Sequence, residues 1–263
     1  MSKFRVAVCE VPAVLSPGAR AWDSLVQRVR RLRPRPDVFV LNEMPFGNWL
    51  ASGPRRVQRL LRESHEAHER GISRLDELGV PVVIGTQAVM RDAGSVNAGF
   101  VWTAGGGLQM PHTKQFFPDE PGYYEARWFE RGNEKFAVVE ARGLKIAFLI
   151  CTDLWFLQWA RQYGKLGADL IVVPRATPRS SLARWKTGVA AAALVSGCYV
   201  ASSNRVGRDR QGMVFGGRGW IFDPSGRQLA ATSAQRPIAV ATIDTAVAQR
   251  AKQEYPQYVK DLE

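Results

Sequence analysis

The chain has 263 residues, of which 46% are apolar and 23% charged, close to the average of globular proteins. This composition excludes a disordered chain, and residues 1–263 are predicted to form a single domain. No window approaches the roughly 18 apolar residues of a membrane span, and the first residues lack the apolar stretch of a secretory signal. The three cysteines form no CxxC pair, which argues against a disulfide framework or a zinc site. We therefore predict a cytoplasmic protein that makes no contact with membranes.

The net charge of +12 raises the question of nucleic-acid binding, because a clustered basic face is typical of proteins that contact phosphates. Arginines are dense at 28–35 and at 55–62. Between these arginines the apolar residues keep helical spacing, so the arginines are predicted to be the solvated faces of two amphipathic helices. No nucleic-acid motif accompanies them. The sequence favours solvated helices, and no nucleic-acid partner is predicted.

Apolar runs and amphipathic stretches alternate along the chain. Strands are predicted where apolar residues follow one another, at 4–10, 37–43, 80–89, 97–104, 136–140, 144–151, 169–174, 198–204, 213–226 and 238–244. Helices are predicted where apolar residues recur at helical spacing, at 19–33, 55–78, 155–166 and 181–196. A long loop rich in Pro, Gly and aromatic residues occupies 111–133. This alternation is typical of an α/β domain whose sheets are covered by helices.

Cys151 stands at the carboxyl end of the predicted strand 144–151, directly before a predicted helix. Strand ends that face a helix N-terminus are common places for chemistry in α/β proteins, and the helix dipole favours a thiolate there. Cys9 and Cys198 fall inside apolar strands, where a cysteine is usually a small buried hydrophobe. Position alone leaves Cys151 open between a nucleophile and a buried side chain.

A nucleophilic cysteine needs a base or a cation beside it, because a thiol is mostly protonated at neutral pH. His65 and His68 lie in HEAHE, one residue short of the HExxH metal pair, and are predicted to be solvated helix surface. His112 remains a candidate partner. Glu43 ends the predicted strand 37–43, and Lys114 lies in PHTKQFFP among aromatic residues. Either residue alone is equally compatible with an ordinary strand end or an exposed loop.

Together, three segments give a stronger indication. LNEMPF contains Glu43, HTKQFFPDEPGYYEARWFERG contains Lys114, and LICTDLWF contains Cys151. In their order and separation these segments resemble the nitrilase (carbon–nitrogen hydrolase) superfamily. The segments GADLIVVPRATP, YVASSNRVG, FGGRGWIFDPSGRQL and YPQYV extend the resemblance to residues 4–260.

The resemblance implies a four-layer α-β-β-α sandwich that assembles as a homodimer or a larger homo-oligomer. It implies Cys151 as nucleophile, Glu43 as general base and Lys114 as oxyanion stabiliser, without a metal or other cofactor. Glu125 matches the family's second glutamate, although a surface ion pair is the alternative for it. The backbone N–H of Thr152 is expected to complete the oxyanion hole. The chain departs from the family pattern at Asn42, where proline is usual, and at Gln158, where glutamate is usual.

The pair Cys151 and Asp153 resembles the amidase branches, so the expected reaction is hydrolysis of a small-molecule amide or N-carbamoyl group. The alternatives are a nitrilase acting on a nitrile and a catalytically idle binding protein on the same fold. Aromatic residues near the triad suggest the walls of a substrate pocket, and Arg175 is a candidate for a substrate carboxylate. Packing or an exposed surface is the alternative for each member of this set, which comprises Phe46, Trp49, Tyr124, Trp155, Phe156 and Arg175.

Overall fold

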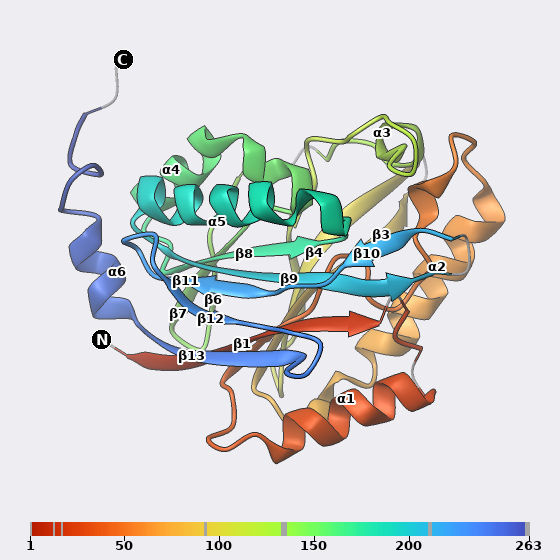
Figure 1. Cartoon of the computed structure of the whole chain (residues 1–263), viewed down its shortest axis with the longest axis horizontal. Coiled ribbons are helices and arrows are strands. Elements are labelled where there is room, and N and C mark those ends of the chain that lie inside the picture. Colours follow the sequence, from red (N-terminus) through yellow and green to blue (C-terminus); the bar gives the residue numbers. More distant parts are fainter. Residues whose placement is uncertain are drawn as a thin grey trace.

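The computed structural model describes residues 2–12, 14–16, 18–91, 94–132, 136–209 and 212–260 (Figure 1). The strands form two sheets, which are connected because one part of β1 pairs with β2 and β13 and its last residues pair with β9. The first has the order β5-β4-β3-β2-β1-β13, and the second has β6-β7-β8-β9 with β10, β11 and β12 beyond β9. The bounds are β1 Lys3–Pro12, β2 Val38–Val40, β3 Val82–Arg91, β4 Gly94–Thr103, β5 Gly107–Thr113, β6 Val139–Ala141, β7 Leu144–Phe148, β8 Leu170–Arg175, β9 Tyr199–Arg208, β10 Val214–Gly216, β11 Trp220–Phe222, β12 Gln228–Ala231 and β13 Ile238–Asp244.

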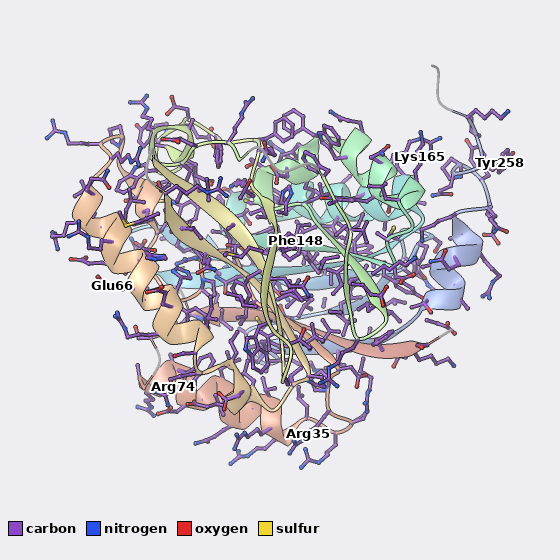
Figure 2. The ribbon with its side chains drawn as sticks, turned by 180° about the vertical axis from the view of Figure 1, so that it is seen from behind. Arg35, Glu66, Arg74, Phe148, Lys165 and Tyr258 are labelled. Carbon is purple, nitrogen blue, oxygen red and sulfur yellow. The ribbon has the colours of Figure 1, made fainter. Side chains whose placement is uncertain are left out.

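The two sheets pack face to face around a core of buried apolar residues. Alternate residues of β1, β2 and β3, among them Val6, Val40 and Ile84, share one buried cluster with Ile146 and Phe148 of β7. Phe148 lies in the middle of the molecule (Figure 2). The approach is so close at Gly99 of β4 that a Cβ there would lie 2.7 Å from the Phe148 ring. Parallel strands buried on both faces explain why the apolar runs were continuous in the sequence.

Helices cover the outer face of each sheet, giving four layers in the order α-β-β-α. On the first sheet, Trp22, Leu25 and Val29 of α1 pack against residues of the opposite face, such as Phe39. On the second sheet, α5 packs through residues such as Val189. Figure 1 shows α4 and α5 on one side of the strands and α1 on the other. The helices are α1 Arg20–Arg31, α2 Gln58–Ile72, α3 Glu125–Trp128, α4 Leu157–Lys165, α5 Leu182–Ser196 and α6 Thr245–Ala251.

Most predicted elements are present, with differences that have local causes. The helix expected at 55–78 is shorter, because α2 ends at Ile72 and a separate 3-10 turn follows at Leu75–Leu78. The strand β5 was not predicted, since its first four residues are exposed and carry no apolar pattern. The strand expected at 213–226 is split into β10 and β11 at a glycine-rich turn, where Gly217 adopts a left-handed conformation (φ 66°).

The arginines of α1 and the segment after it are exposed, as predicted, and Figure 2 places Arg35 and Arg74 at the periphery of the molecule. The prediction for His68 was wrong, because this side chain is fully buried on the inner face of α2. Within the described ranges, no helix is both long and apolar enough to cross a bilayer.

Candidate active site

The three predicted catalytic side chains come from strand ends that meet at one edge of the sandwich. Glu43 follows β2, Lys114 directly follows β5, and Cys151 follows β7. Glu43 and Lys114 are fully buried, and Cys151 is 4% exposed. Because β2 and β7 run parallel to their neighbours β1 and β8, their carboxyl ends bring loops from both sheets to the same edge.

Lys114 is held between two buried carboxylates. Its Nζ donates to Glu43 Oε1 at 2.9 Å and to Glu125 Oε2 at 2.5 Å. The surface ion pair considered for Glu125 is therefore wrong, since this side chain is fully buried. Asn97, which the sequence did not single out, donates its Nδ2 to Glu43 Oε1 at 2.8 Å. A polar residue in the largely apolar stretch of β4 was the feature of the sequence that could have indicated a functional role for Asn97.

The ionisation of this cluster follows from burial and charge. Burial alone lowers the pKa of Lys114, but the negative charges of Glu125, Glu43 and Cys151 outweigh burial, so the net pKa lies above the usual value. Burial raises the pKa of Glu125 to about 8, against the opposing effect of the Lys114 charge. Lys114 thus stays an ammonium between the two acidic side chains.

The fully buried side chain of Arg205 holds the loop after β2 in place through hydrogen bonds. Its guanidinium donates to the carbonyl oxygens of Glu43 (3.0 Å), Gly47 (3.1 Å) and Met44. Met44 has a left-handed backbone (φ 45°), and its N–H donates to Thr86 Oγ1 at 2.8 Å. Non-glycine residues rarely adopt this conformation, and such strain is often found at functional sites.

Cys151 shows the same backbone feature, with φ 46°, at the start of a 3-10 turn that runs to Trp155. The N–H of Ala176, after β8, donates to its sulfur. Burial raises the pKa of the Cys151 thiol well above its usual value, the charge of Glu43 raises it further, and Lys114 opposes both. The resting group is a thiol, so a reaction at its sulfur requires a base.

Asp153 links the 3-10 turn that begins at Cys151 to the segment that carries Lys114. One carboxylate oxygen accepts from the N–H groups of Gln115 (3.0 Å) and Phe116 (2.9 Å). The other accepts from the N–H of Ile150 (3.2 Å) and pairs with His112 Nε2 at 3.0 Å. His112, the alternative partner considered for the thiol, is therefore a partner of Asp153 and positions the turn.

Cys151 opens onto a cavity of about 370 Å³. Thr152 is part of the wall, and its hydroxyl donates to the Phe116 carbonyl at 2.7 Å. Two indole rings, Trp155 and Trp185, lie with their centroids 4.7 Å apart. The lining comprises Pro118, Glu120, Tyr123, Glu125, Cys151, Thr152, Trp155, Ala176, Thr177, Pro178, Ser181, Arg184 and Trp185.

Of the predicted pocket residues, Trp155 is in this lining and five are not, namely Phe46, Trp49, Tyr124, Phe156 and Arg175. Phe46 and Trp49 pack in the interior, and Phe156 stacks on Phe116. The Arg175 side chain is fully buried and binds Ser202 Oγ at 2.6 Å, Thr177 Oγ1 at 2.9 Å and the Arg218 carbonyl. The prediction that it meets a substrate carboxylate was therefore wrong.

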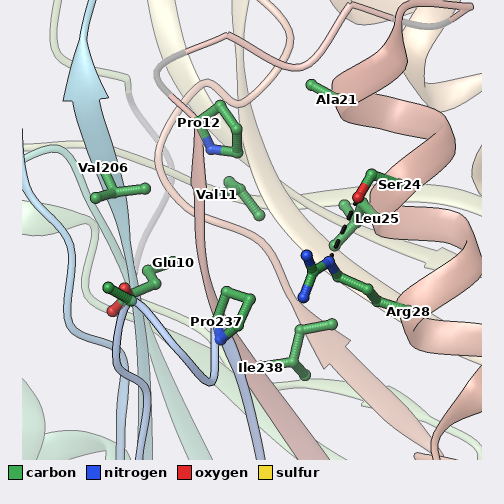
Figure 3. A pocket seen from close by; sticks show the side chains of 11 residues that line it. Glu10, Val11, Pro12, Ala21, Ser24, Leu25, Arg28, Val206, Pro237 and Ile238 are labelled. Carbon is green, nitrogen blue, oxygen red and sulfur yellow. Dashed lines mark hydrogen bonds between the residues drawn. The ribbon is translucent and has the colours of Figure 1, made fainter.

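A second cavity of about 310 Å³ lies between α1 and the ends of β1 and β9 (Figure 3). Its lining is largely apolar and includes two charged side chains, Glu10 and Arg28, of which Arg28 contacts Ser24 at 3.4 Å. No cysteine or lysine is among the described residues that line it. Elsewhere in the described chain, no group of three or more His, Cys, Asp or Glu side chains is placed to hold a metal ion.

Comparison with known proteins gives the site its context. The sequence model of the carbon–nitrogen hydrolase family matches residues 6–253. The omega-amidase YafV of Escherichia coli (strain K12) is 31% identical over 176 residues, 66% of this chain and 64% of YafV. The chain thus matches slightly less than two thirds of that relative's length.

Two solved structures share the fold at low sequence identity. A carbon–nitrogen hydrolase from Helicobacter pylori G27 has a TM-score of 0.86 at 20% identity, over 98% of this chain and 94% of that one. A mutant of the amidase from Nesterenkonia sp. AN1 has a TM-score of 0.76 at 18% identity, over 94% and 92%. The family match across nearly the whole chain and the shared four-layer architecture lead to one conclusion. The chain belongs to the carbon–nitrogen hydrolase family.

Proposed function

We propose that the chain is an amidase that cleaves a small amide or N-carbamoyl group through a thioester on Cys151. Glu43 takes the thiol proton, and the sulfur attacks the carbonyl carbon. Lys114 and the N–H of Thr152 stabilise the oxyanion. The C–N bond breaks, and ammonia or an amine leaves with the proton from Glu43. Glu43 then takes a proton from water, which attacks the thioester, and the released sulfur regains its proton.

The observation that carries this proposal is the buried ammonium of Lys114, which is held by Glu43 and by Glu125 of the cavity wall and whose charge acts on Cys151. An ammonium held at a fixed position by two buried carboxylates is preorganised for a developing negative charge. Glu43 Oε2 has no hydrogen-bond partner among the described residues, which leaves this oxygen available for a proton. A binding protein would have no need for this combination.

The similar proteins favour an amide over a nitrile. YafV is called an omega-amidase, and the Nesterenkonia structure carries the acetamide moiety of fluoroacetamide covalently at its active-site cysteine. We propose the same role for Cys151. A nitrilase remains the alternative reaction.

We further propose that residues 1–263 form one carbon–nitrogen hydrolase domain and that it assembles as a homodimer or larger homo-oligomer. The family match over 6–253 supports the first point. Two exposed leucines support the assembly: Leu166 (46% exposed) at the end of α4 and Leu194 (42% exposed) on α5, both on the helices that cover the second sheet. Exposed apolar residues often mark interfaces.

A substrate panel tests the reaction. Ammonia release is measured with butyramide, succinamate, N-carbamoylglycine and butyronitrile, and methylamine release with N-methylbutyramide. We expect turnover of at least one amide or carbamoyl compound and none with the Cys151→Ala variant. Hydrolysis of butyronitrile alone would assign a nitrilase, and the absence of turnover across the panel would favour the idle binding protein.

A further inference from the structure

Tyr123 stands two residues before Glu125, and the local structure holds its ring in place. A tight turn closes between Glu120 and Tyr123, whose backbone groups exchange hydrogen bonds of 2.8 and 3.3 Å. The Trp49 ring packs on the Tyr123 ring with a centroid distance of 5.8 Å. Trp49 is itself fixed, because its Nε1 donates to the Gly122 carbonyl at 2.9 Å. The ring therefore presents its hydroxyl in a defined direction.

That hydroxyl is buried without a partner. The Tyr123 side chain is part of the wall of the Cys151 cavity and is partly exposed, but its oxygen is shielded from solvent and has no hydrogen-bond partner among the described residues. Buried tyrosine hydroxyls normally find one, and an unpaired buried polar group is costly. Such a group in a native protein calls for an explanation.

The same centre holds two further unpaired atoms. Glu43 Oε2 and Glu125 Oε1 are also buried without a partner among the described residues. An NH2 group in the tetrahedral intermediate offers two N–H donors and one lone pair. Glu125 Oε1 and the Tyr123 hydroxyl can accept the two N–H bonds, and the lone pair is left for the proton that Glu43 Oε2 carries. The unpaired atoms of the resting site thus match the nitrogen side of a primary amide.

The charges around Tyr123 keep its hydroxyl protonated. Burial raises the pKa of its phenol, and the negative charges of Cys151, Glu43 and Glu125 raise that pKa further. Tyr123, Glu125 and Cys151 line the same cavity. The neutral hydroxyl can therefore accept a hydrogen bond from an N–H group and donate one to water.

We propose that Tyr123 contacts the substrate: its hydroxyl accepts a hydrogen bond from an N–H of the leaving nitrogen, whose lone pair takes the proton from Glu43, and then donates to the oxygen of the water that replaces ammonia. This role rests on the amidase function proposed for Cys151. Tyr123 transfers no proton, since Glu43 takes and returns it, and it serves to orient the reacting atom. An oriented nitrogen and an oriented water lower the barriers of both halves of the reaction.

Tyr123→Phe tests the role, with Tyr124→Phe as the matched control, because Tyr124 is the adjacent residue and does not line the cavity. With the fastest amide of the panel, Tyr123→Phe should lower kcat/KM by about 10–100-fold, the effect of losing one hydrogen bond at a polarised group. Its melting temperature should stay the same or rise, because the hydroxyl has no partner in the free protein. Tyr124→Phe should change kcat/KM by less than about two-fold.

Three outcomes separate the possibilities. Loss of activity without loss of stability, and with iodoacetamide labelling of Cys151 unchanged, supports the contact. Wild-type kcat/KM in Tyr123→Phe overturns it, as does a fall in melting temperature that parallels the loss of activity, since that result would show a structural partner. Turnover that survives in Cys151→Ala would instead contradict the proposed function itself.

Discussion

The three cysteines of the chain occupy two kinds of surroundings. Cys9 and Cys198 lie inside the fold, where their sulfurs donate to the carbonyls of Val40 (3.3 Å) and Ala168 (3.0 Å). Burial raises the pKa of Cys9 to about 12 and that of Cys198 to about 11. Neither of them lines the cavity at the strand ends.

Burial likewise raises the pKa of Cys151, so a raised pKa does not distinguish this thiol from the other two. The difference is in what surrounds it. Cys151 faces a cavity, and the charges of Glu43 and Lys114 act on its sulfur. We therefore expect reactivity among the three thiols to depend on a neighbouring proton acceptor and on space for a substrate, rather than on the resting pKa of the thiol.

The largest expected effect comes from removing each sulfur in turn. Cys151→Ala should abolish turnover without unfolding the protein, because no other thiol lines the cavity among the described residues. Cys9→Ala and Cys198→Ala should keep wild-type kcat while lowering the free energy of unfolding by about 1–3 kcal/mol through lost packing. Turnover assays paired with urea unfolding give both quantities. An inactive but stable Cys9→Ala variant would erase the contrast between the two surroundings.

Lys114→Met probes the charge beside Cys151 and should give the next largest effect. It removes an ammonium that acts mainly in the transition state, so kcat should fall by about 10²–10³-fold. Lys114→Arg should not restore activity, because a planar guanidinium cannot replace a compact ammonium between Glu43 and Glu125. Steady-state kinetics at saturating amide measure the effect. Wild-type kcat in Lys114→Met would remove Lys114 from the mechanism, and wild-type kcat in Lys114→Arg would show that any cation suffices at this position.

A smaller effect is expected on stability, from the pH dependence caused by His68. This buried titratable residue lies outside the lining of the Cys151 cavity. Burial lowers the pKa of His68 to about 4. As pH falls from about 6.5 to 4, His68 is protonated in the unfolded chain before it is protonated in the folded one. The free energy of unfolding therefore falls by up to roughly 3 kcal/mol over that window. His68→Gln should flatten the loss, whereas His65→Gln on the same helix should not. Urea midpoints between pH 7 and 4.5 measure it, and equal slopes in all three proteins would contradict the account.

The strand ends that carry Glu43 and Cys151 were predictable, because continuous apolar runs mark buried strands and the motifs mark the residues after them. The burial of His68 was not predictable, because the buried face of α2 consists of Leu61, Ser64, His68 and Gly71, and only Leu61 of these is a typical apolar core residue. Gly71 is required there, since a Cβ would lie 2.3 Å from the Phe46 ring.

The cavity wall was the least predictable part of the site. Much of it comes from the irregular segment before Glu125 and from the start of α5, and no periodic pattern fixes which side chains of such a segment turn inward. Tyr123 and Tyr124 are adjacent and chemically identical, and only the folded turn distinguishes them. Of the aromatic residues expected in the wall, Trp155 is there, whereas Phe46 and Trp49 pack inside the fold and Phe156 stacks on Phe116.

The most direct test of the central claim is peptide mapping of the earliest iodoacetamide adduct by mass spectrometry, in the wild type and in Glu43→Gln. The account predicts that Cys151 is alkylated first, because it alone combines access from the cavity with a neighbouring base, and that Glu43→Gln slows this labelling. An earliest adduct on Cys9 or Cys198, or a rate at Cys151 that is indifferent to Glu43, would contradict the assignment of Cys151 as the nucleophile and Glu43 as its base.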